Sequence, residues 1–411
     1  MKILLLSITI LLLLLVLRYA IFFKYNQPLK SGDSFISEVT LLSEPQENFG
    51  KQMFYVQDIK VEAPFFPKLS YGDRLRVKGV IEEYSYIRVG SSQEVEQLVI
   101  KSPEITLLPQ RNIFISQAAF LRGRVYENFK SVLPGNESAL LFGIVFGGSS
   151  GFSTQMKDTF RNTGVLHVVA ASGMNVSMVG AFLLSFLCLL MPRRKALFFS
   201  VVGIFYYALI SGFEPSIVRA SIMICLTFSA GILGRQNYAY FTLFLTAWIM
   251  MIFQPLVVFE VGFLLSFSST IGIVAIKPLF DSLSLMKKTK AVTDDISTTI
   301  SAQAASVPIM VGSFSAYSLL SVLVNALVLW TIPFLMILGG VASFCAIFIP
   351  FLSFIPLYVS LPFLLYFEQV VYKFGSVPLL HIEHISLVFW VGYYMVLGGV
   401  VFWGHSKKQK S

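Results

Sequence analysis

Apolar segments long enough to cross a membrane recur along this chain of 411 residues and restrict its fold more than any other feature. A helix needs about 20 apolar residues to cross the hydrocarbon core of a bilayer. Because 55% of all residues are hydrophobic, a water-soluble fold could not bury them. The sequence therefore predicts a polytopic α-helical membrane protein, in which 317–350 counts as one kinked span or two. The candidate spans lie at about 165–190, 196–211, 215–233, 239–253, 256–276, 296–312, 317–350, 352–374 and 386–403.

Residues 30–110 differ from these apolar segments. Short runs such as SFISEVTLL and DRLRVKGVIEEY are rich in β-branched and aromatic residues, and turn-forming residues separate them. This pattern predicts a small all-β domain with the size and strand number of an oligonucleotide-binding (OB) barrel. The domain holds 9 basic and 12 acidic residues, a net charge of −3, so the rest of the chain carries +12.

Basic runs indicate how the chain is oriented in the membrane. They lie at 192–195 (PRRK) and 287–290 (KKTK), and a basic tail occupies 405–411. Such runs mark the cytoplasmic edges of membrane spans. Counting spans back from 192–195 places the β domain outside the cytoplasm. Residues 1–24 lack a small-x-small cleavage pattern, so we expect a transmembrane anchor there and not a removed signal peptide.

Residues 111–162 have a helical period and are predicted to form amphipathic helices at the membrane surface or across the bundle. In the first of them Ala118, Val125 and Phe129 share one face, and we expect Arg122 and Arg124 to lie elsewhere on the helix.

Pro, Gly and Ser interrupt many of the spans in 163–404, which is typical of broken or re-entrant helices that line a cavity. A charged group at bilayer depth costs about 2.5–3.5 kcal/mol, so such groups usually meet one another or a wet path. Arg219 lies five residues into a span, and Glu214 or Glu260 could pair with it to close the bundle. The favoured alternative is a hydrated cavity. Further polar residues inside the spans are His167, Ser172, Asn175, Gln303 and Asn325.

The sequence gives no clear pattern for a metal site or a catalytic centre. His381 and His384 have His-x-x-His spacing, but no third ligand accompanies them. His167 and Ser172 would lie about 140° apart on a helix, a poor arrangement for a base and its nucleophile. We therefore expect no catalytic residue, no metal and no cofactor, and an intramembrane hydrolase is the least favoured alternative.

Several motifs follow one another in a specific order. LLFGIVFGG precedes TFRNTGVLHVVAASGMNVSMVGAF, in which Thr-Gly-x-x-His is followed by a Ser-Gly pair. SGFEPSIVRASIM, QPLVVFEVGFLLSFSSTIGIV and FSAYSLLSVLVNALVLWTIP come next. Together with the β domain, over about residues 30–350, these motifs resemble the ComEC family of competence proteins, the inner-membrane channels for transforming DNA. Family members usually have a second His where this chain has Asn175. Many end with a metallo-β-lactamase-like domain that is absent from this sequence.

The resemblance implies a channel that moves single-stranded DNA across the bacterial cytoplasmic membrane during natural transformation, with the OB-like barrel on the outer side. It implies a separate cytoplasmic motor or strand-binding protein and a separate nuclease, and it leaves open a homo-oligomer. A transporter of a smaller solute on the same scaffold is the alternative. The implied path is lined by His167, Ser172, Asn175, Arg219, Gln303 and Asn325. An outer basic funnel is implied at Arg122, Arg124, Lys130 and Arg161.

Overall fold

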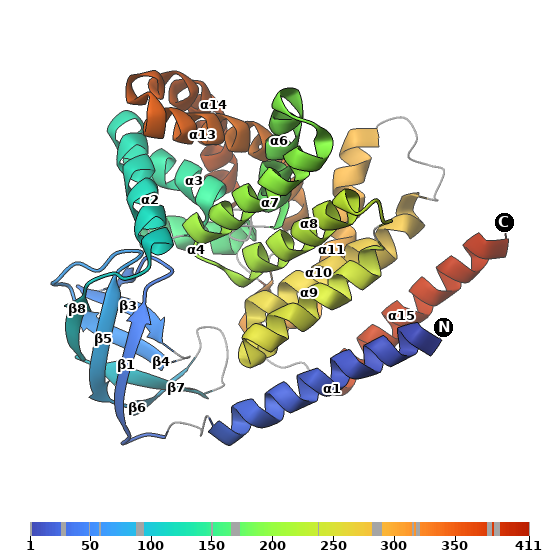
Figure 1. The fold of residues 1–411 in the computed structure, drawn as a ribbon, viewed down its shortest axis with the longest axis horizontal. Helices are drawn as coiled ribbons and strands as arrows, with labels where there is room; N and C mark the ends of the chain where they lie inside the picture. The colour runs from blue at the N-terminus through green and yellow to red at the C-terminus, as the bar shows by residue number, and fades with distance from the viewer. Residues whose placement is uncertain are drawn as a thin grey trace.

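In the computed structural model the chain is mostly helical, with a β region near its N-terminus (Figure 1). The structure describes residues 2–25, 30–48, 50–56, 59–87, 94–148, 151–165, 173–236, 238–281, 290–314, 316–317, 321–375, 380–381 and 387–410. The strands are β1 (Ser34–Thr40), β2 (Gln46–Asn48), β3 (Lys51–Val56), β4 (Ile59–Pro64), β5 (Arg74–Val80), β6 (Glu82–Ile87), β7 (Glu94–Lys101), β8 (Glu104–Leu108), β9 (Ala316–Tyr317) and β10 (Leu380–His381).

The helices follow the apolar segments of the sequence. They are α1 (Lys2–Tyr25), α2 (Ile113–Val132), α3 (Gly135–Phe146), α4 (Thr154–Thr163), α6 (Gly173–Leu190), α7 (Arg193–Ile210), α8 (Pro215–Ile232), α9 (Ala239–Phe253), η1 (Pro255–Phe259), α10 (Val261–Asp281), α11 (Lys290–Phe314), α12 (Ser321–Val328), α13 (Thr331–Phe348), η3 (Pro350–Leu352), α14 (Phe354–Gly375) and α15 (Leu387–Lys410). The apolar stretch 317–350 is thus divided between α12 and α13.

Five helical segments in the described part of the chain are long and apolar enough to cross a membrane. They are Gly173–Leu190, Pro215–Ile232, Val261–Leu279, Thr331–Phe348 and Pro350–Gly375.

The β region consists of two sheets around one core. One sheet has the order β1-β5-β8 and the other β2-β3-β4-β7-β6, and β4 pairs with β7 in parallel. Buried residues alternate along the strands, as at Leu75 and Val77 in β5 and at Ile59 and Val61 in β4. These side chains belong to the same hydrophobic cluster, so the two sheets face each other.

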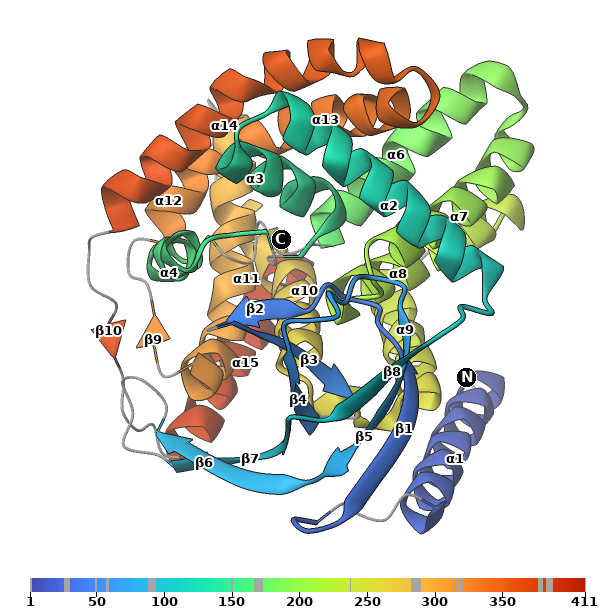
Figure 2. The same cartoon turned by 90° about the vertical axis from the view of Figure 1, so that its left-hand side faces the viewer.

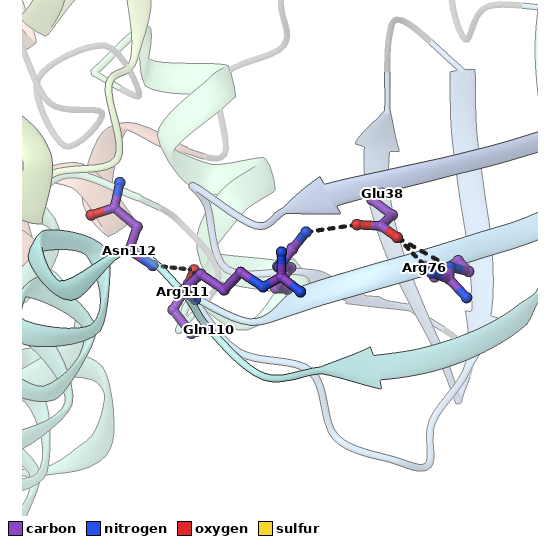
Figure 3. Close-up of polar contacts among 6 residues, drawn as sticks. Glu38, Arg76, Gln110, Arg111 and Asn112 are labelled. Carbon is purple, nitrogen blue, oxygen red and sulfur yellow. Dashed lines mark hydrogen bonds and ion pairs between the residues drawn. The ribbon is translucent and has the colours of Figure 1, made fainter.

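The outer face of the first sheet is polar, and the chain passes from it directly into the helices. Glu38 lies between Arg74 and Arg76, at 2.7 Å and 2.6 Å, and the hydrogen bond from Arg76 holds the pKa of this carboxyl below its usual value (Figure 3). Gln110 accepts hydrogen bonds from the next two backbone N–H groups. Asn112 then accepts from the N–H of Phe114 and caps the N-terminus of α2.

The short helix α3 lies at the centre of the largest core. Every residue from Ser138 to Phe146 is buried. Figure 2 shows α3 among α2, α13 and α14, whose apolar side chains belong to the same cluster. A helix that is apolar on all sides is stable only inside a bundle, so α3 organises the helices around it.

The N-terminal and C-terminal helices pack on other helices through side-chain donors. Arg18 of α1 donates to the carbonyl of Ile252 at the end of α9, and Trp248 of α9 donates to the carbonyl of Leu11. In α15, Tyr393 and Tyr394 donate to consecutive carbonyls of α11.

The β region and the helices meet at a junction with very close backbone contacts. Gly212, in the turn between α7 and α8, has a φ of +89°, and a Cβ there would lie 2.2 Å from the carbonyl oxygen of Leu42. The Tyr71 hydroxyl donates to the carbonyl of Leu209, and both residues pack against Ala118 of α2. A side chain at position 212 therefore cannot be accommodated without moving the β region.

We predict that Gly212→Ala lowers the melting temperature of the detergent-purified protein more than Gly32→Ala does. Gly32 has a similar φ of +93°, but a Cβ there would have no atom within 4 Å. Both substitutions cost about 1–2 kcal/mol through the left-handed backbone. Overpacking against Leu42 adds about 1–3 kcal/mol at position 212 alone. Equal melting temperatures of the two variants would contradict the proposed role of the close contact.

Candidate functional site

The turn between α7 and α8 positions a buried arginine. Gly212 and Phe213 both have positive φ, which reverses the chain. Pro215 then begins α8, where its missing N–H is not needed. Arg219 follows one helical turn later, so its side chain enters the bundle near one end of a candidate membrane span.

The Arg219 guanidinium is held by hydroxyl groups of α10. Its Nε donates to Ser266 Oγ at 2.5 Å, and its Nη1 donates to Thr270 Oγ1 at 2.7 Å. Ser266 and Thr270 are four residues apart, so they lie on the same face of the helix. The ring of Phe267 lies 5.9 Å from Arg219 Cζ, and only 9% of Arg219 is exposed.

The charge of Arg219 is not balanced by a carboxylate in the part of the chain that the structure describes, where no ion pair forms at its guanidinium. Of the two partners considered from the sequence, Glu214 lies beside Arg122 and Glu260 accepts a hydrogen bond from Gln254 at 2.7 Å. Hydroxyl groups accept hydrogen bonds from the guanidinium N–H groups, but they carry no charge that could balance it. The bundle therefore contains a desolvated positive charge beside neutral partners.

Gly173 makes room for this guanidinium. A Cβ at Gly173 would lie 2.6 Å from Arg219 Nη2 and 3.4 Å from Ala220 Cβ. Gly173 is the second residue of the Ser-Gly pair in the sequence motif, so this position of the motif lies against Arg219. His167 and Ser172 themselves lie outside the described residues.

Asn175 links α6 to the end of α3 through a hydrogen bond. Its Nδ2 donates to the carbonyl of Ile144 at 2.7 Å, and the hydroxyl of Tyr207 in α7 donates to the carbonyl of Val145 at 2.6 Å. Both acceptors belong to the last turn of α3, where carbonyls have no partner within the helix. Asn175 is fully buried.

Gln303 and Asn325 form a second polar group on α11 and α12. Gln303 donates to Ser321 Oγ at 3.3 Å. Ser321 and Asn325 are one turn apart on α12, and Asn325 Oδ1 accepts no hydrogen bond from the described residues. Of the predicted lining residues that the structure describes, Gln303 and Asn325 thus belong to a group separate from Arg219.

The four predicted funnel residues have different environments. Arg122 is 5% exposed and points into the junction, so the expectation that it lies away from the apolar face of α2 is wrong. Arg124 is exposed and donates to the carbonyl of Ala346, and Lys130 is also exposed. Arg161 is exposed and lies 3.4 Å from Asp158.

Carboxylates surround Arg122 at the junction. Arg122 Nε lies 3.9 Å from Glu44 Oε1, and its Nη1 donates to the carbonyl of Ile210 at 2.7 Å. Burial raises the pKa of the nearby Glu214 carboxyl, and the Arg122 charge opposes this shift. This arginine therefore has ionic partners, unlike Arg219.

Among the described residues, no group of three or more His, Cys, Asp or Glu side chains could hold a metal ion. The side chains of the four histidines lie outside this description, including the His-x-x-His pair at 381 and 384. The absence of a metal site therefore stays a prediction.

With five apolar helices of sufficient length in its described part, the chain is a membrane protein whose helical bundle contains a buried arginine. It belongs to the competence protein family, whose family model, described as Competence protein, matches residues 144–407. The two polar groups described above lie within this range. The match confirms the resemblance to ComEC proteins that the order of the motifs indicates.

Two relatives match about half of this chain. ComE operon protein 3 of Bacillus subtilis (strain 168) is 24% identical over 224 residues, which are 54% of this chain and 28% of that protein. An uncharacterized protein of Aquifex aeolicus (strain VF5) is 28% identical over 231 residues, 56% of this chain and 53% of that protein. The chain thus covers less than two thirds of the length of either relative. No solved structure matches it.

We predict that Asn175→Asp destabilises the helical bundle by about 1–3 kcal/mol at neutral pH. An ionised carboxylate cannot donate to the carbonyl of Ile144, and it would place a buried charge against that oxygen. Thermal unfolding of the purified protein measures the effect. Ser177→Ala is the matched control on the same helix, because the Ser177 hydroxyl is exposed and bonds only within its own helix, to the carbonyl of Gly173. If Asn175→Asp melts like the control, the bond to α3 does not hold the bundle together.

Proposed function

We propose that this chain forms a channel for single-stranded DNA across the bacterial cytoplasmic membrane during natural transformation. Membership of the competence protein family supports a role in DNA uptake. The observation that carries the channel proposal is the buried guanidinium of Arg219, which has hydroxyl partners and no carboxylate partner among the described residues. An anion that passes this point would supply the missing negative charge.

Single-stranded DNA fits this requirement because it brings one phosphate charge with every nucleotide. Arginine has five donors in a planar fork that suits phosphate oxygens. Ser266 and Thr270 engage Nε and Nη1, while Nη2 lies against Gly173 at the start of α6. A phosphate at Arg219 would not have to break an existing ion pair, so binding there can be weak and reversible, as conduction requires.

The proposed path continues through the predicted lining residues. We propose that His167 and Ser172, which directly precedes Gly173 in the sequence, also line this path. Gln303 and Asn325 offer amide groups to the bases, and Asn325 Oδ1 has no hydrogen-bond donor among the described residues. In this scheme Asn175 keeps the wall of the path in place through its bond to α3.

We infer that the β region is an OB-like barrel on the outer side of the membrane and acts as a collar for the entering strand. The shared core of its two sheets supports a small closed barrel. The exposed basic residues Arg124, Lys130 and Arg161 would attract the strand toward the helices. Re-entrant segments within the bundle are part of the same proposal.

The channel needs a separate source of energy. With the membrane negative inside, each inward phosphate meets about 2.3 kcal/mol per 100 mV. We therefore propose a separate cytoplasmic motor or strand-binding protein that pulls the strand. We also propose a separate nuclease that produces the single strand from duplex DNA. In this proposal the chain itself performs no catalysis.

Arg219→Ala is predicted to abolish uptake of labelled single-stranded DNA into vesicles that contain the purified protein, because the phosphates lose their partner at bilayer depth. Arg219→Lys keeps a charge but not the planar fork, so we expect partial uptake. Arg235→Ala is the matched control, since Arg235 follows the same helix and is exposed.

The same vesicles separate the two candidate functions. Normal DNA uptake by Arg219→Ala, at equal protein abundance, would contradict the role of the buried guanidinium. Uptake of a small anionic solute by wild-type vesicles that exclude single-stranded DNA would favour the transporter alternative.

A further inference from the structure

A cavity of about 200 Å³ lies at the junction between the β region and the helices. Glu44, Tyr55 and Lys60 contribute to its wall from the β region, and Arg122, Gly148 and Glu214 contribute from the helices. Sites for whole drug-sized ligands are larger, about 300–1,000 Å³. The cavity is therefore too small to enclose a whole drug-sized ligand.

One wall of the cavity combines an aromatic ring with a positive charge. Tyr55 in β3 and Lys60 in β4 are directly opposite each other in the antiparallel register, so their side chains are neighbours on one face. Tyr55 is 61% exposed. Exposed aromatic rings beside basic residues are the usual platform for stacked bases of single strands.

Lys60 belongs to an ion-pair cluster of the β region that extends beyond the cavity wall. Lys60 Nζ lies 2.8 Å from one oxygen of Glu62, and Lys51 Nζ lies 3.3 Å from the other. One carboxylate thus serves two ammonium groups. The hydrogen bond from Lys60 lowers the pKa of Glu62, so the carboxylate is ionised at neutral pH and the trio keeps a net charge of +1.

The opposite wall offers donors and acceptors held in fixed positions. Arg122 is 5% exposed, and its guanidinium lies 5.2 Å from the ring centre of Tyr71 and 4.9 Å from that of Phe142. Its Nε has no hydrogen-bond acceptor within the described chain and faces Glu44 at 3.9 Å. The carboxylates of Glu44 and Glu214 can accept from the exocyclic amine of a base.

We propose that this cavity binds one nucleotide of single-stranded DNA, with the base against Tyr55, the phosphate near Lys60 and the polar edge of the base toward Glu44, Arg122 and Glu214. The proposal rests on the channel function, for which it supplies the first binding site of the strand. A free phosphate would make no use of the exposed ring, and an apolar ligand would cover the charged groups of both walls without bonding to them. A nucleotide uses all three kinds of group.

The preference among bases follows from the acceptors. Cytosine presents an exocyclic amine and thymine does not, so we expect oligo-dC to bind several-fold more tightly than oligo-dT. A strand has many phosphates and a mononucleotide has one. Free dCMP is therefore expected to compete only weakly with oligo-dC, which distinguishes a DNA strand from a free nucleotide as the ligand.

The experiment measures binding of fluorescent oligo-dC to the full-length protein in detergent. We expect Tyr55→Ala to weaken binding about tenfold, through loss of one stacked base, and Tyr55→Phe to restore most of it. Lys60→Ala should reduce the slope of log affinity against log salt by about 0.7, the value for one phosphate contact on a single strand. Melting temperatures establish that the variants are folded.

Tyr84 and Lys101 provide a matched control pair. Lys101 Nζ lies 5.1 Å from the ring centre of Tyr84 on β6 and β7, and neither residue lines the cavity. Tyr84→Ala and Lys101→Ala should leave affinity within twofold of wild type. If Tyr55→Ala and the controls bind alike while wild type binds and transports DNA, the cavity proposal is overturned and the channel function stands. If wild type neither binds nor transports single-stranded DNA, both are overturned.

Discussion

The helical bundle depends on the hydrogen-bond donors that reach the backbone carbonyls at the C-terminal end of α3. A helix leaves its last carbonyls without internal partners, and burying them unpaired is costly. Here three neighbouring helices supply the donors: Asn175 of α6 bonds Ile144, Tyr207 of α7 bonds Val145, and Arg122 of α2 reaches Gly147 at 3.5 Å. Since α3 is buried along most of its length, these contacts fix the relative positions of the helices that carry the candidate site.

The structure places two buried arginines in contrasting surroundings. Arg122 lies at the C-terminal ends of α3 and α7, where the helix dipoles favour a cation, and Glu44 and Glu214 lie nearby. Arg219 lies near the start of α8 and has neutral hydroxyl partners from Ser266 and Thr270. The first arrangement explains a stable junction. The second leaves a charge available for an anion, which is why the channel proposal is built on Arg219.

The sequence predicts the helical segments well because apolar length is a local property, and the order of the motifs is sufficient to identify the family. The amino-acid sequence also indicates that Arg122 is buried. Arg122 lies four residues after Ala118 and three before Val125, in phase with the apolar face of α2. The partner of Glu214 could not be predicted in this way. Its neighbour Arg122 lies 92 positions earlier in the chain, and their proximity depends on how the β region closes on the bundle. Ser266 and Thr270 were missed because hydroxyls one turn apart in an apolar helix usually bond to their own backbone.

The turn between α7 and α8 links the junction to the buried site. Arg122 binds the carbonyl of Ile210 at its start, and Gly212 contacts the backbone of Leu42 in its middle. The N–H groups of Ile217 and Val218 in the first turn of α8 bond to the carbonyl of Glu214, so the turn leads directly into the helix. Arg219 lies on this first part of α8. This turn therefore connects the close contacts of the junction directly to the helix that carries the guanidinium.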